Sequence, residues 1–293
     1  MPEKIPTISI CNLLGKDHSI QDVIVYDLKD FINHHQDIKF PHRHSFYQVL
    51  YITEGKGTHV IDFENHLVKK GMIYFLAPSQ VHEWLFSENA NGVLINFNEN
   101  LFSSFLANSH YLNDFPFFTA NGMHSSVDLS DDNVSLLKIE QLLFNIQMEM
   151  SSCDECKLDL TKIMLLQVFL LVNRKVNLSQ NIPTNKNNYL VYRNFEKLIE
   201  QHFTKMRMPK DYANLLFVTP NHLNALCNQL FGKSAGDIIR NRVLLEAKRL
   251  LVNSTQNINE IAWYLNFEDN SYFSKFFKKY EGITPDEFRK NKH

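Results

Sequence analysis

Two short amphipathic helices joined by a tight turn are predicted between residues 254 and 290, and this segment constrains the fold most. Asn257 can cap the first helix and Glu260 can reach back to the cap, as in a capping box. Apolar residues then recur at i, i+3, i+4 and i+7, namely Ile258, Ile261, Ala262 and Leu265. Asn266 stands where the chain must reverse, and Asn tolerates left-handed backbone geometry. The pattern is typical of a helix-turn-helix.

The second helix of this pair is predicted to begin after Asp269, a favourable N-cap, and it has two unlike faces. Phe273 and Phe277 fall on one face and can reach a core. The other face carries polar and cationic residues, namely Asn270, Ser271, Ser274, Lys275 and Lys278. Such a face suits the major groove of DNA, although an amphipathic helix on any protein surface would show a similar pattern.

A second copy of this pattern over residues 209–231 favours the helix-turn-helix. Thr219, fifty residues before Asp269, can cap a helix whose first position is Pro220, where the missing N–H costs nothing. Leu223, Leu226 and Cys227 would face inward, and Asn221, Asn224, Ala225 and Asn228 would face outward. Asn can pair bidentately with adenine. Between the two copies, a helix from Ser234 to Val252 carries a broad apolar stripe and could hold two reading heads apart.

Residues 191–290 resemble the DNA-binding domain of the AraC family of bacterial transcription regulators. The resemblance is carried by HLNALCNQLFGKSAGDIIRNRVLLEAKRLL and INEIAWYLNFEDNSYFSKFFKKYEGITPDEFR, in that order. It implies that two heads enter successive major grooves, about one helical turn apart. It implies base or backbone contact for Asn221, Asn224 and Ala225 in the first head and for Asn270, Ser271, Ser274, Lys275 and Lys278 in the second.

The sequence departs from the family pattern in both heads. Ala225 and Cys227 stand where Arg and Phe are usual, and Asn266 replaces the usual turn Gly of the second head. Because the first head lacks that Arg, we expect the second head to supply most of the DNA-binding energy.

Charge is divided unevenly along the chain. Residues 189–293 hold 16 Lys and Arg against 11 Asp and Glu, whereas residues 1–188 hold 14 against 21. A basic C-terminal third favours phosphate contact at one end only, although a chance asymmetry would look similar. At 293 residues, 44% hydrophobic and 21% charged, the chain is long enough for two globular domains.

The N-terminal sequence lacks the basic start and apolar block of a signal peptide, and the longest apolar run, Ile163 to Val172, is too short to span a bilayer. We therefore expect a cytoplasmic protein with no membrane contact.

Four cysteines fit a reducing compartment. Cys153 and Cys156 form a C-x-x-C that could mark a redox pair or half of a zinc site, but without a second pair we favour a polar turn between helices.

Between residues 20 and 100 the chain contains short runs rich in Val, Ile, Tyr and Phe, separated by turn signals. The runs are Gln48–Thr53, His59–Phe63, Met72–Ala77, Glu83–Phe86 and Gly92–Phe97. Their regular spacing predicts a closed or rolled antiparallel barrel. The segments PHRHSFYQVLYITEGKG and FLAPSQVHEW resemble the cupin-type sensor domain of many AraC-family members, which implies a small-molecule effector bound in the barrel.

His42, His44 and His82 are the candidate effector-binding residues, and they raise a rival hypothesis. Their spacing resembles the ligand layout of metal-binding cupins, and three imidazoles could hold a divalent metal. The expected carboxylate position, however, carries Gln48, and a His-x-His pair shares one face of any strand because the strand period is two. We therefore expect no metal and no other cofactor, and we assign the three histidines to an effector-pocket wall or a polar rim at the barrel mouth.

Two apolar helices are predicted after the barrel. The first runs from Asp131 to Met150, and the second, Leu158–Arg174, is apolar on nearly every side. One barrel can cover only one face, so we expect a homodimer, and the resemblance agrees because these sensor domains commonly dimerise through such helices. The alternative is a hairpin packed entirely on its own barrel.

Residues 176–188 are polar, Asn-rich and interrupted by Pro183, which predicts a linker.

The sequence thus predicts an α+β multidomain protein with an N-terminal cupin-like β-barrel, a helical hairpin and a C-terminal all-α domain with two helix-turn-helix motifs. The expected boundaries are 1–130 for the barrel, 131–175 for the hairpin, 176–188 for the linker and 189–293 for the DNA-binding domain. The predicted function is transcriptional regulation, as an activator and not as an enzyme, with promoter DNA, a small-molecule effector, RNA polymerase and a second copy of the chain as partners. Two alternatives stay open: a metal-dependent cupin enzyme fused to a DNA-binding domain, and a ligand-independent regulator whose barrel is filled with side chains.

Overall fold

The computed structural model describes residues 6–13, 22–35, 40–103, 111–118, 124–179 and 186–291. The chain divides into two compact units, one from Pro6 to Gln180 and the other from Asn181 to His293. Among the described helices, none combines the length and the apolar character that crossing a membrane requires.

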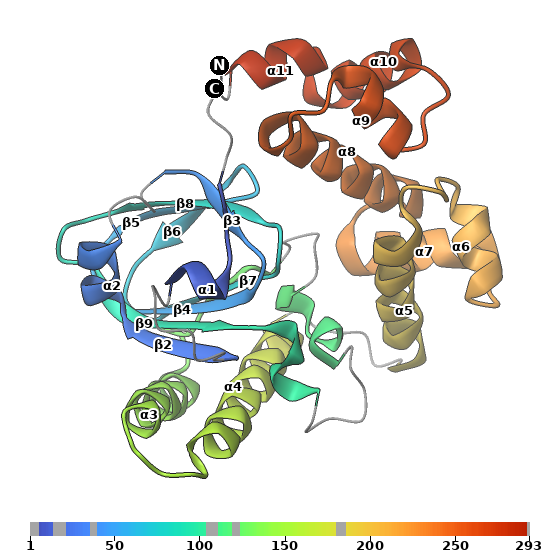
Figure 1. Ribbon diagram of the computed structural model, residues 1–293. Helices are drawn as coiled ribbons and strands as arrows, with labels where there is room; N and C mark the ends of the chain where they lie inside the picture. The colour runs from blue at the N-terminus through green and yellow to red at the C-terminus, as the bar shows by residue number, and fades with distance from the viewer. Residues whose placement is uncertain are drawn as a thin grey trace. The chain divides into compact units, whose positions relative to one another are not determined.

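Two five-stranded sheets form the β-rich part of the N-terminal unit (Figure 1). The first contains, in order, β1 (Thr7–Ile8), β3 (His42–His44), β8 (Val81–Phe86), β5 (Gly57–Ile61) and β6 (Glu64–Val68). The second contains β10 (Ser126–Asp128), β7 (Met72–Leu76), β4 (Tyr47–Glu54), β9 (Asn91–Phe97) and β2 (Val23–Asp27). Neighbouring strands are antiparallel except β1 and β3.

Alternate residues of the second sheet point into two different cores, because successive side chains of a strand face opposite sides. In β4, Leu50 and Ile52 join a core shared by both sheets, whereas Val49 and Tyr51 face the core under the helices. The core between the sheets is filled with large buried side chains, among them Phe31, Phe46, Tyr74 and Trp84. The interior of the barrel is therefore well packed over much of its volume.

Five short helices and a helical hairpin complete this unit in the described residues. Short helices are α1 (Ile10–Leu13), α2 (Leu28–His34), η2 (Glu99–Phe102), η3 (Tyr111–Asp114) and η4 (Pro116–Phe118). The predicted hairpin is α3 (Asn133–Met150) and α4 (Lys157–Ser179), which lies against the sheet that contains β2 and β9 (Figure 1). Cys153 and Cys156 are exposed in the turn between these two helices.

The strand predictions were incomplete. The five predicted strands correspond to β4, β5, β7, β8 and β9, but β1, β2, β3, β6 and β10 were missed. β6 is polar over Glu64, Asn65 and His66 because it is an edge strand, so it lacks the apolar signal. Phe63, predicted at the end of a strand, instead lies with Asp62 in a two-residue hairpin turn, with φ of 75° and 48°.

The C-terminal unit is all-helical in the part that the structure describes. Its helices are α5 (Lys186–His202), α6 (Pro209–Leu215), α7 (Pro220–Phe231), α8 (Ala235–Asn253), α9 (Ile258–Tyr264), α10 (Asn270–Glu281) and α11 (Pro285–Asn291). The segment predicted as a linker, 176–188, is helical at both ends, because α4 continues to Ser179 and α5 begins at Lys186. The rest of that segment lies outside the described residues. The predicted fold class is confirmed.

Candidate nucleic-acid interface and effector site

The second helix-turn-helix is α9, a tight turn and α10. Asn257 and Glu260 form the predicted capping box, and the Asp269 side chain accepts a hydrogen bond from the backbone N–H of Tyr272 at the start of α10. Asn266 is left-handed, with φ of 57°. The N–H of Phe267 then donates to the carbonyl of Ala262 over 2.8 Å, which closes the turn.

The first helix-turn-helix, α6, turn and α7, repeats this geometry. The N–H of Val218 donates to the carbonyl of Ala213 over 3.0 Å, and Thr219 caps α7. The left-handed turn position is held by Phe217, with φ of 55° and a side chain that is 96% exposed. Gly232 and Gly282 end α7 and α10 in left-handed conformations fifty residues apart. The two helix-turn-helix motifs therefore have the same turn geometry.

Ion pairs tie the long helix α8 to α5 on one side and to α10 on the other. The Arg242 guanidinium lies 2.9 Å from Glu200 on α5 and 2.9 Å from Glu246 on α8. Lys248 lies 3.0 Å from Glu281 at the end of α10. Several partly buried contacts hold one geometry better than a single exposed pair would, so α8 can fix the separation of the two heads.

The structure divides the predicted DNA-contacting residues into two groups. Six are exposed on α7 or α10, namely Asn221, Ala225, Asn270, Ser271, Lys275 and Lys278. Asn224 and Ser274 are only half-exposed and have partners within the unit. The Asn224 side-chain oxygen accepts a hydrogen bond from the N–H of Ala235 at the start of α8, and the Ser274 hydroxyl donates to Asn270. Asn224 thus helps to position α7 against α8.

Two residues beside the second head were missed by the sequence reasoning. A surface pocket at the start of α10 is lined by Arg207 and Tyr272 together with Asn266, Ser271 and Lys275, among others. Arg207 precedes α6, yet its guanidinium donates to the Leu265 carbonyl and lies 3.7 Å from the centre of the Phe267 ring. The sequence around Arg207 does not predict this contact, because Arg207 and Leu265 are 58 residues apart along the chain. Two cations, Arg207 and Lys275, thus line the pocket beside the second head, whereas the exposed face of α7 carries no Lys or Arg.

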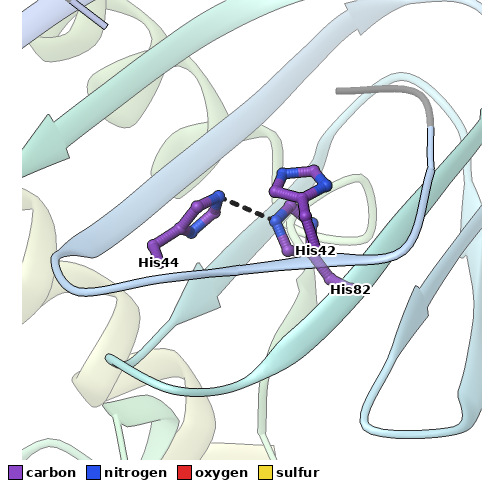
Figure 2. Close-up of side chains that lie close together, drawn as sticks. All are labelled: His42, His44 and His82. Carbon is purple, nitrogen blue, oxygen red and sulfur yellow. Dashed lines mark hydrogen bonds between the residues drawn. The ribbon is translucent and has the colours of Figure 1, made fainter. Parts of the chain in front are cut away.

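In the barrel, His42, His44 and His82 converge on one buried point (Figure 2). Strand pairing brings this about, since β3 and β8 are antiparallel with His42 opposite His82. The Nε2 atoms of His44 and His82 are 2.9 Å apart, and one ring nitrogen of each of the three lies within 4.8 Å of the others. A fourth buried histidine, His59, places its Nε2 3.0 Å from Nδ1 of His82.

These rings are held away from water. Burial, reinforced by the neighbouring histidines, keeps the pKa of His44, of His59 and of His82 well below the usual histidine value. The rings are therefore neutral near pH 7, and each presents one N–H and one lone pair. The arrangement does not match a polar rim at the barrel mouth, one of the two expected placements, because the three side chains are at most 3% exposed.

The outer face of the hairpin carries two exposed stripes with alternating steps of three and four residues. On α3 the stripe is Val134, Leu137, Gln141, Phe144 and Met148, and its apolar members are 55–65% exposed. On α4 it is Leu160, Ile163, Gln167, Leu170 and Arg174, and its apolar members are 42–48% exposed. This spacing is that of a seam between packed helices.

Two helix-turn-helix units on one connecting helix, together with a β-barrel unit, define a DNA-binding regulator with a sensor domain. Comparison with known families agrees. The family model of an AraC-like ligand binding domain matches residues 31–147, and that of a helix-turn-helix domain matches residues 212–291. The chain belongs to the AraC family of transcription regulators.

Similar proteins span most of the chain. The HTH-type transcriptional activator RhaS of Escherichia fergusonii is 23% identical over 256 residues, which are 86% of this chain and 88% of that protein. RhaR of Escherichia coli O139:H28 is 21% identical over 260 residues, 87% and 88% of the two chains. Among solved structures, ToxT from Vibrio cholerae O395 aligns over 91% of this chain and 96% of its own, with 15% identity and a TM-score of 0.40.

Proposed function

We propose that this AraC-family regulator activates transcription by placing α7 and α10 in successive major grooves of promoter DNA. The observation that carries the proposal is the repeated turn geometry of the two heads, each with a recognition helix that exposes a polar face. Both similar regulators named above are activators, which supports activation and makes RNA polymerase the proposed protein partner. A role on promoter DNA also agrees with a cytoplasmic location. No reaction is proposed.

Within this scheme, base or phosphate contacts are assigned to Asn221 and Ala225 on α7 and to Asn270, Ser271, Lys275 and Lys278 on α10. Asn224 and Ser274 are proposed to contribute less to DNA contact, since a side-chain atom of each already forms a hydrogen bond within the protein. The cations lie on α10, so the second head is proposed to supply most of the affinity. The DNA-binding domain is proposed to span residues 189–293 and the sensor barrel residues 1–130.

The barrel is proposed to bind a small effector near His42, His44 and His82. Large side chains fill the core between the sheets, so the proposed effector is a small ligand. The same packing also favours a second candidate, a regulator that works without an organic ligand. The apolar stripes on α3 and α4 support a homodimer formed through residues 131–175, which would present paired DNA-binding domains to paired half-sites.

The test is a fluorescence-anisotropy titration of the full chain with duplex promoter DNA over a range of salt concentrations. Binding through phosphates predicts a log–log salt dependence with a slope of about −0.9 for each phosphate neutralised. Substituting both Lys275 and Lys278 with Ala should make the slope shallower, and substituting Lys69 and Lys175, which are paired with acids in the other unit, should not. A folded protein that does not bind duplex DNA at low salt would refute the proposal.

A further inference from the structure

We propose that His42, His44 and His82 form a binding site for one divalent transition-metal ion, with His59 as a positioning residue. This deepens the effector part of the proposed function, since it assigns a metal ion to the same three histidines, and it does not depend on DNA contact, which uses none of these residues. It also departs from the expectation of no metal that the sequence alone supported. Hydrogen bonds decide which ring nitrogens carry a proton and which can bind a metal ion.

The tautomer of His42 is set by the backbone. Its Nδ1 lies 2.8 Å from the carbonyl oxygen of Phe40. A carbonyl oxygen can only accept, so Nδ1 must carry the hydrogen and donate it. In the neutral ring, Nε2 of His42 therefore holds the lone pair. A ring N–H bound to a backbone carbonyl is the arrangement that orients metal-binding histidines in proteins.

The tautomer of His82 is set by a chain of two hydrogen bonds. The indole N–H of Trp84, which can only donate, lies 3.1 Å from Nε2 of His59. That nitrogen must therefore be an acceptor. It also lies 3.0 Å from Nδ1 of His82, so the hydrogen of this second bond must reside on His82. Nε2 of His82 consequently carries no hydrogen, and its lone pair points at His44 (Figure 2).

His44 has no tautomer that satisfies both of its nitrogens. If its Nε2 carries the hydrogen, it donates to Nε2 of His82 over 2.9 Å, and its Nδ1 becomes a buried acceptor with no partner among the described residues. If Nδ1 carries the hydrogen, two lone pairs face each other at 2.9 Å. A cation between the rings converts this repulsion into coordination, because it can accept a lone pair from His42, His44 and His82 together.

The spacing of the nitrogens suits such an ion. Bonds of about 2.0–2.1 Å from Zn²⁺ to histidine place two nitrogens of a tetrahedral site roughly 3.4 Å apart. The observed separation is 2.9 Å for one pair, which is shorter than this value, and the three ligand nitrogens all lie within 4.8 Å of one another. Small rotations of rings that already share one buried point would complete the site.

The donor set selects the kind of ion. Within the described residues, the cluster offers neutral imidazole nitrogens and neither carboxylate nor thiolate. Imidazole suits Zn²⁺, Ni²⁺, Cu²⁺ and Fe²⁺, whereas Mg²⁺ and Ca²⁺ require oxygen ligands. Three neutral ligands leave the charge of the ion uncompensated, so the remaining coordination position suits hydroxide or an anionic small molecule.

The test uses the full chain, purified without an affinity tag and freed of metal with a chelator. Titration with Co²⁺, followed by its visible absorption, should saturate at one equivalent per chain, and Zn²⁺ should displace the signal. His82→Gln and His44→Gln should each abolish the absorption band. His66→Gln is the matched control, because His66 lies in the same barrel but bonds to Ser126, and this variant should still bind one equivalent.

His59 requires its own pair of variants. His59→Phe removes the acceptor that fixes His82 and should weaken Co²⁺ binding by about 10- to 100-fold, the usual cost of losing an outer-shell partner. His59→Gln retains an acceptor oxygen and should recover much of that affinity. Equal losses in both variants would reduce His59 to a packing role and overturn its assignment.

Metal binding by the wild type and by the ligand variants tests whether the metal site exists. Wild-type protein that binds well below one equivalent, or His82→Gln and His44→Gln proteins that bind as the wild type does, would overturn it. Thermal unfolding without metal shows which variants fold, and Zn²⁺ should raise the midpoint of the wild type and of His66→Gln but not that of a folded His44→Gln protein. Loss of metal binding with DNA binding intact refutes this inference alone, and absence of DNA binding refutes only the proposed function.

Discussion

Replacing Leu137 with Asp should dissociate the proposed dimer. Leu137 belongs to the exposed stripe of α3 and is 65% exposed in the single chain. Complete burial of a Leu side chain contributes about 1.5–3 kcal/mol, so covering the exposed part contributes about 1–2 kcal/mol. A two-fold interface contains the residue twice, and the loss becomes about 2–4 kcal/mol, or about 30- to 700-fold in the dimer dissociation constant. An unpaired buried carboxylate would add to this loss.

Light scattering and sedimentation of the full chain at tens of micromolar are the appropriate measurements. Leu67→Asp is the matched control, because Leu67 is also a Leu, is 64% exposed and lies on the edge strand β6, away from the hairpin. The wild type and the Leu67 variant should be dimers, and the Leu137 variant should be a monomer that still folds. A wild-type monomer, or a Leu137 variant that dimerises as tightly as the control, would refute the reasoning from the exposed stripes.

Three further predictions concern the C-terminal unit. Lys275→Ala should weaken DNA binding by about 1–3 kcal/mol in an anisotropy titration and Asn221→Ala by less, and equal losses would contradict the unequal division between the heads. Phe217→Gly should stabilise the protein by up to about 1 kcal/mol in urea unfolding. The left-handed conformation costs a residue other than Gly about 1–2 kcal/mol, and the larger conformational entropy that Gly loses on folding offsets about 0.5–1 kcal/mol of the gain. An unchanged or lower unfolding midpoint would contradict this prediction. Burial raises the pKa of the Cys227 thiol to about 12, so alkylation at neutral pH should label Cys153 in the folded protein and Cys227 only after unfolding, as peptide mapping would show.

The helix-turn-helix units could be predicted because their signals are local. The Asn257–Glu260 capping box and the caps Thr219 and Asp269 act within one helical turn, and the structure contains all of them. The left-handed turn at Asn266 was likewise readable from the residue type. The equivalent turn at Phe217 was not readable, since a bulky aromatic residue gives no signal for positive φ.

The hairpin shows where periodicity stops being informative. Helical spacing identified the apolar residues of α3, yet it did not separate those that face the sheet from those that face away. The structure buries Ile139, Leu143 and Ile146 and leaves Val134 and Leu137 exposed. Asn224 illustrates the same limit for polar residues, because its partner, the N–H of Ala235, belongs to the next helix.

The sequence by itself determined that His42 and His44 would share one face wherever this segment is extended, because the side chains of a strand repeat every two residues. Only the tertiary structure decided that they meet His82 and His59, because this depends on the register between β3, β8 and β5. That register is fixed by pairing between segments up to 40 residues apart along the chain and by the packing of both sheets. Local patterns encode helices, caps and faces, whereas the convergence of buried side chains on one point is a property of the whole barrel.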